Sequence, residues 1–71
     1  MSSGRVGHGV TLFRMNAETF PDDVNAQFHY GEAFRYTGRP DEAAGQYRKV
    51  LALDPEHANA AARLAEVTRA G

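Results

Sequence analysis

The sequence contains no cysteine, so neither a disulfide nor a thiolate metal site can support the fold, whatever the redox compartment. The two charge signs are nearly balanced, because 8 Lys and Arg residues are interspersed with 9 Asp and Glu residues, for a net charge of −1. The absence of a basic stripe argues against nucleic acid or an anionic membrane surface as a partner. No apolar run approaches the ~20 residues that span a bilayer, and the first nine residues do not resemble a secretory signal. We therefore expect a cytoplasmic protein.

Residues suited to catalysis or metal binding are also scarce. The only serines are Ser2 and Ser3, and no nucleophile with a base and an orienting group can be assembled from them. His8, His29 and His57 are not spaced four residues apart, as paired metal ligands on one helix would be. The sequence therefore predicts that the chain is not an enzyme and that it holds neither a metal nor a cofactor.

A chain of 71 residues can form one small domain, and its core must be thin. Small domains without disulfides or metals depend on regular helix packing or on a partner. We therefore expect helix packing and self-association to support the fold.

The hydrophobic pattern predicts four helices, at about residues 10–20, 23–36, 40–53 and 56–69, because apolar residues recur with helical spacing. Residues 1–9 are rich in glycine and serine and are expected to be a disordered leader. No stretch alternates with period two, so the predicted fold class is all-α.

Turn signals separate the expected helices. Asp22 or Asp23 can cap the second helix, and Gly38 suits the left-handed residue that ends it. Pro40 suits the first turn of the third helix, where Asp41 and Glu42 face the positive end of the helix dipole. These paired carboxylates are therefore assigned to helix starts and not to catalysis.

An internal repeat is present. Three pairs of residues are separated by the same number: Pro21 and Pro55 (55 − 21 = 34), Phe13 and Tyr47 (47 − 13 = 34), and Tyr30 and Leu64 (64 − 30 = 34). A period of this length indicates helical hairpin units.

The middle unit resembles the tetratricopeptide repeat (TPR) family. Small residues stand where two helices would cross, aromatic residues stand around that crossing, and a proline ends the unit. Gln27 departs from the pattern, which has an aromatic residue there, and the adjacent Phe28 is expected to take part of that role. The motif reads Gln27-x₂-Tyr30-Gly31-x₂-Phe34, then Ala43-x₃-Tyr47, then Pro55.

The resemblance implies antiparallel helix–turn–helix units forming a fragment of a right-handed superhelix. It divides a TPR-like domain over 10–71 into a half repeat (10–20), a full repeat (21–54) and a final helix (55–71). A weaker resemblance, over Leu12 to Pro55, is to the TPR-like segment that follows the catalytic domain of some β-lactamase-like serine hydrolases.

Candidate partner-binding residues form a second stripe beside the core-facing stripe of the second helix. In TPR arrays the corresponding face lines a concave groove, so the resemblance implies a protein or peptide partner there. Some family members clamp a peptide carboxylate on this face, but a negative Glu32 disfavours that mode. The candidates are Asn25, Phe28, Glu32, Arg35 and Tyr36, continued in the final helix by Asn59 and Glu66.

Five other aromatic residues are assigned to the core because they occupy repeat packing positions: Phe13, Phe20, Tyr30, Phe34 and Tyr47. The sequence thus predicts a non-catalytic protein–protein interaction module with a TPR-type groove. The alternatives are a dimerisation or assembly element and an accessory C-terminal piece of a larger hydrolase. Repeat folds usually need about three units, so a symmetric homodimer is expected.

Overall fold

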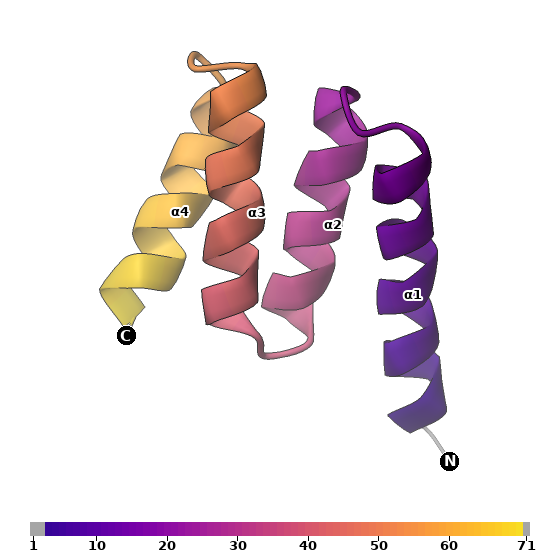
Figure 1. The fold of residues 1–71 in the computed structure, drawn as a ribbon. Helices are drawn as coiled ribbons and strands as arrows, with labels where there is room; N and C mark the ends of the chain where they lie inside the picture. The colour runs from indigo at the N-terminus through magenta and orange to yellow at the C-terminus, as the bar shows by residue number, and fades with distance from the viewer. Residues whose placement is uncertain (1–2, 71) are drawn as a thin grey trace.

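The computed structural model describes residues 3–70, and its secondary structure in that range is entirely helical. Four helices follow one another: α1 (Ser3–Thr19), α2 (Val24–Tyr36), α3 (Pro40–Leu53) and α4 (Ala58–Ala70). They form a single row of antiparallel neighbours with α1 at one edge and α4 at the other (Figure 1). The row measures 39 × 30 × 14 Å. The expected all-α architecture of helix–turn–helix units is confirmed.

Two helix starts, those of α1 and α4, differ from the expected ones by more than one residue. Residues 3–9 belong to α1, whereas the sequence predicted a disordered leader there, and the rest of that leader, 1–2, lies outside the described residues. Once a helix is nucleated, each further residue adds a backbone hydrogen bond, so a segment whose one large apolar residue is Val6 can still be helical. The assignment of the helices to a half repeat, a full repeat and a final helix stays a prediction.

The helix ends follow local signals. Asp23 caps α2, because its carboxylate accepts from the backbone N–H of Asn25 at 3.0 Å and of Ala26 at 3.4 Å. Gly38 follows α2 with φ of +76°, a left-handed conformation that favours glycine. The fourth helix begins two residues later than expected because His57 is its cap, with Nδ1 accepting from the N–H of Ala60 at 3.0 Å.

The core lies between α2, α3 and α4. Its tightest point is the crossing of α2 and α3, where an added Cβ on Gly31 would lie only 2.9 Å from Cε1 of Tyr47. Tyr47 and Ala43 are fully buried, which confirms that small and aromatic residues alternate across this crossing. The buried cluster comprises Phe34, Ala43, Ala44, Tyr47, Val50, Ala60 and Val67.

Gln27 is a buried polar residue that joins three elements. Its side-chain nitrogen donates to the carbonyls of Ala17 at 2.9 Å and Pro21 at 3.2 Å. Its side-chain oxygen accepts from Nε2 of Gln46 at 2.8 Å, so both ends of the amide are satisfied. The departure from the family pattern is therefore a polar clamp between the end of α1, the following turn and α3.

Two of the five aromatic residues assigned to the core lie at the surface. Phe34 and Tyr47 are buried and Tyr30 is half-buried, as expected. Phe13 and Phe20 are 40% and 54% exposed, which contradicts their assignment. The exposure of both rings follows from the position of α1 and the turn after it at the edge of the row, where the main neighbour of α1 is α2.

Candidate binding groove

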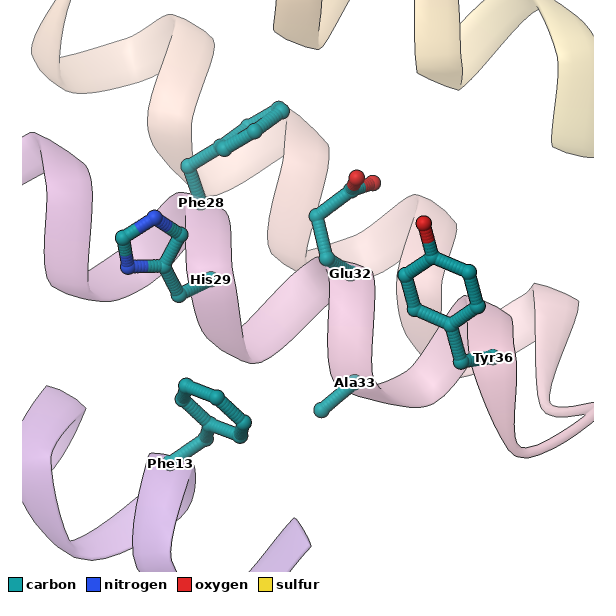
Figure 2. A pocket seen from close by; sticks show the side chains of 6 residues that line it. All are labelled: Phe13, Phe28, His29, Glu32, Ala33 and Tyr36. Carbon is teal, nitrogen blue, oxygen red and sulfur yellow. The ribbon is translucent and has the colours of Figure 1, made fainter. Parts of the chain in front are cut away.

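A pocket of about 410 Å³ opens between α1 and α2. Phe13 comes from α1, and the other lining side chains come from successive turns of α2 (Figure 2). Phe28, Glu32 and Tyr36 are spaced at i, i+4 and i+8, which places them along one line of the helix. The lining residues are Phe13, Phe28, His29, Glu32, Ala33 and Tyr36.

Aromatic side chains form the walls of the pocket, and a small side chain forms its base. Phe13 meets His29 edge to face, with ring centroids 6.2 Å apart. Ala33 is buried and lies between Phe13 and Tyr36 (Figure 2), so no bulky side chain fills the base. Tyr36 is 76% exposed at one end of the groove. An occupant could therefore contact aromatic surface on several sides.

Phe28 belongs to both the pocket and the core. Its ring centroid lies 5.0 Å from that of His57 and 5.8 Å from that of Tyr47. Because Tyr47 is buried on α3 and His57 caps α4, Phe28 joins the start of the groove to both later helices. The aromatic role expected for Phe28 beside Gln27 is thus confirmed by its packing.

Alternating charges cross from α2 to α4 along the same face. Glu32 accepts hydrogen bonds from Nε of Arg35 at 3.2 Å and from the buried hydroxyl of Tyr47. Its carboxylate also lies 3.5 Å from Nε of Arg63 on α4. Nη1 of Arg63 in turn donates to Glu66 at 3.2 Å. Two carboxylates and two guanidinium groups therefore balance one another within the network.

The pKa values in this network follow from its contacts. Burial acts to raise the pKa of the Glu32 carboxyl, but the hydrogen bonds from Arg35 and Tyr47, together with the charges of Arg35 and Arg63, outweigh burial and lower that pKa. Burial and then the bond to Glu32 raise the pKa of the Tyr47 hydroxyl. Glu32 is therefore an ionised acceptor whose charge is already neutralised.

The predicted site residues are only partly brought together. Phe28, Glu32 and Tyr36 line the pocket, and Arg35 lies beside it with its guanidinium 4.7 Å from the centroid of the Tyr36 ring. Glu66 is connected through Arg63. The two asparagines, Asn25 and Asn59, are exposed and do not line the pocket. Their role in binding stays a prediction.

Sequence reasoning missed four residues of this face: Phe13, His29, Ala33 and Arg63. The first three line the pocket, and Arg63 bridges α4 to α2. The aromatic character of Phe13 was recognised, but its exposure depends on which helices pack beside α1. The contact from Arg63 to Glu32 joins residues 31 apart in sequence (63 − 32 = 31), a separation without a local signal.

Among the side chains that the structure describes, 10–69, no group of three or more His, Cys, Asp or Glu is placed to hold a metal ion. No described helix combines the length and the hydropathy that crossing a membrane requires.

Comparison with known proteins gives consistent matches. A family model described as "Tetratricopeptide repeat" matches residues 24–67. The chain is 36% identical over 59 residues to Protein O-mannosyl-transferase TMTC1 of Homo sapiens, a match that covers 83% of this chain and 7% of that protein. The Mus musculus protein of the same name is 34% identical over 59 residues, covering 83% and 6%. The chain thus spans less than a tenth of these relatives. No solved structure matches it significantly.

Proposed function

Because this chain belongs to the tetratricopeptide repeat family, we propose that it is a non-catalytic module that binds a protein or peptide partner in the groove of α2. The partner contributes an uncharged apolar or aromatic side chain to the pocket between Phe13 and Tyr36. Repeats of this kind present helix faces to partners, and an apolar side chain on a helix or peptide is a common anchor in such grooves.

The observation that supports this proposal is an aromatic pocket beside charges that are already paired. A ligand carboxylate would meet Glu32, and a ligand cation would compete with Arg35 and Arg63, which lie 3.2 and 3.5 Å from that carboxylate. An uncharged apolar group disturbs none of these contacts and removes aromatic surface from water. The charge balance thus favours an apolar anchor over a charged terminus.

The likeness to an O-mannosyl-transferase extends no activity to this chain. It covers 59 residues and 7% of that protein, so we propose no transfer of mannose here. The predicted cytoplasmic location and the accessory role in a larger hydrolase stay predictions.

Titration with small probes followed by NMR tests the groove. N-acetyl-tryptophan amide should shift the backbone amide signals of Phe13, His29 and Ala33, whereas acetate and methylguanidinium should leave them unchanged. Loss of Tyr36 in a Tyr36→Ala variant should weaken the tryptophan response about tenfold, the effect of an anchor worth about 1.4 kcal/mol. Equal shifts with acetate, or none with the tryptophan probe, would contradict the proposal.

A matched control and a partner screen complete the experiment. Phe20→Ala removes an aromatic ring that is 54% exposed but does not line the pocket, so it should leave the probe response unchanged. Peptides selected for binding from a random helical library should carry a large apolar residue whose replacement by alanine abolishes binding. Peptides selected through a terminal carboxylate would overturn the apolar-anchor proposal.

A further inference from the structure

The two edges of the helix row leave unpacked faces. Each inner helix packs on both sides, since α2 contacts α1 and α3, and α3 contacts α2 and α4. By contrast, α1 packs mainly on α2 and α4 mainly on α3. Leu12 is 55% exposed and Phe13 is 40% exposed on α1, and the alanines Ala61 and Ala65 are exposed on α4.

The repeat period relates these two faces to a helix pair that already exists within the chain. A shift of 34 residues superimposes α4 on α2 and α1 on α3, as with Leu64 on Tyr30 (64 − 30 = 34) and Phe13 on Tyr47 (47 − 13 = 34). The outer faces of α4 and α1 are therefore equivalent to the two sides of the α2–α3 crossing.

Small and aromatic residues match across the equivalent positions. Ala65 on α4 stands at the position of Gly31 (65 − 31 = 34), and Phe13 on α1 stands at that of Tyr47. Within the chain, the Gly31 backbone receives the Tyr47 ring at close range. Ala65 and Phe13 would form a small-to-large contact of the same kind, and because a Cβ at Gly31 would lie 2.9 Å from the Tyr47 ring, the methyl group of Ala65 requires a wider helix crossing than that of α2 and α3.

A second pair changes character on both sides together. Gln27 and Gln46 are joined by a hydrogen bond of 2.8 Å across the α2–α3 crossing. Their equivalents are Ala61 (61 − 27 = 34) and Leu12 (46 − 12 = 34), which are both apolar. If only one member had changed, a polar group would be left without its partner. Instead, both pairs are matched, because Gln27 and Gln46 are both polar and Ala61 and Leu12 are both apolar.

From this matching we infer that the outer face of α4 receives α1 of a second copy of this chain, so that two copies complete one helical repeat between them. The contact is heterologous, because it joins two different faces, unlike the symmetric homodimer expected from the sequence. The faces lie at opposite edges of the row (Figure 1), so the assembly grows as an open stack. This inference goes beyond groove binding and does not depend on it.

The exposed area indicates a weak contact. The chain exposes 4788 Å², compared with roughly 4,400 Å² for a typical folded monomer of its mass, an excess of about 400 Å². A stable interface buries about 800 Å² on each partner. Asn16 also stands at the position of the buried Val50 (50 − 16 = 34), which places a polar group in the contact. Association should therefore depend strongly on concentration.

The stack would extend the binding groove. Phe28 and Glu32 on α2 are equivalent to Ala62 (62 − 28 = 34) and Glu66 (66 − 32 = 34) on α4. A second copy docked in the inferred register would place its own Ala62 and Glu66 beside Phe13 of the first copy, which forms one wall of the pocket. The pocket in each inner copy of the stack would thus have a wall on its open side.

Complementation between two blocked variants tests the inference by sedimentation equilibrium, from low micromolar to near-millimolar concentration. Leu12→Glu blocks the α1 face and Ala65→Glu blocks the α4 face, and both sites are exposed, so helicity by circular dichroism should be retained. The wild-type mass should rise with concentration beyond that of two chains. Each variant alone should stay at the mass of one chain, and an equimolar mixture should reach a mass twofold higher.

The outcomes separate this arrangement from its competitors. Ala52→Glu introduces the same charge at an exposed alanine on α3, away from both faces, and should assemble like the wild type. A symmetric α1–α1 contact would leave the Ala65→Glu variant dimeric, which overturns the inference. A wild-type chain that stays at the mass of one chain overturns it as well, as does a mixture that never exceeds that mass. If Ala65→Glu lost helicity, Ala61→Glu would block the same face.

Discussion

Two helix glycines should respond differently to replacement by alanine, since only Gly45→Ala should stabilise the fold. Gly45 lies on α3 with nothing within 4 Å of an added Cβ, so Gly45→Ala brings only the helix propensity of alanine, about 0.8–1 kcal/mol of stabilisation. Gly31 would gain the same propensity, but its Cβ would lie 2.9 Å from Tyr47 Cε1 and 3.2 Å from Gln46 Cβ. Overpacking of this kind costs about 1–3 kcal/mol. Gly31→Ala should therefore range from neutral to about 2 kcal/mol destabilising.

Urea denaturation followed by circular dichroism measures both variants against the wild type. The two should differ by about 1–3 kcal/mol, which corresponds to several degrees in Tm or more for a domain of this size. Stability of a small domain is only a few kcal/mol, so such a difference is readily resolved. Equal stabilisation by both substitutions would refute the close approach of α2 and α3 at Gly31. Destabilisation by Gly45→Ala would refute its open surroundings.

Two further predictions concern the charge network and the start of α4. The lowered pKa of the Glu32 carboxyl means that Glu32 adds stability above its ordinary pKa and loses it as pH falls through the lower folded value. Glu32→Gln should therefore be less stable than the wild type by about 1 kcal/mol at pH 7 and equally stable in acid. Urea denaturation at several pH values measures this. A stability difference that stays constant across pH would contradict the prediction. At the α4 cap, His57→Ala should be about 0.5–2 kcal/mol less stable than His57→Asn, because both lose the ring but only asparagine can cap Ala60. Thermal melts that show the two variants equal would exclude capping by this side chain.

The helical architecture was predictable because its signals are local or periodic. The turn at Gly38, the cap at Asp23 and the period of 34 residues each require no knowledge of tertiary contacts. Gly31 and Ala43 were assigned to the helix crossing from the repeat pattern, and both are buried there.

The candidate site was less predictable because its contacts join separate elements. Gln27 departs from the family pattern, which has an aromatic residue at its position. The sequence gives no reason for this departure, because the partners of Gln27 include the backbone carbonyls of Ala17 and Pro21, which sequence patterns do not reveal. The helical stripe on α2 located Phe28, Glu32 and Tyr36 correctly at one surface. It could not show that an arginine from α4 neutralises Glu32, because that depends on how three helices pack.

Repeat equivalence predicts which positions correspond, while exposure depends on neighbours. Phe13 and Tyr47 occupy the same position in successive units, yet Tyr47 is fully buried and Phe13 is 40% exposed. The difference arises because α3 lies between two helices and α1 has its main contact on one side. A helix placed against the other side of α1 would bury Phe13 as Tyr47 is buried. Its exposure therefore bears on both proposals, since Phe13 forms a wall of the groove and lies on the face that a second copy would cover.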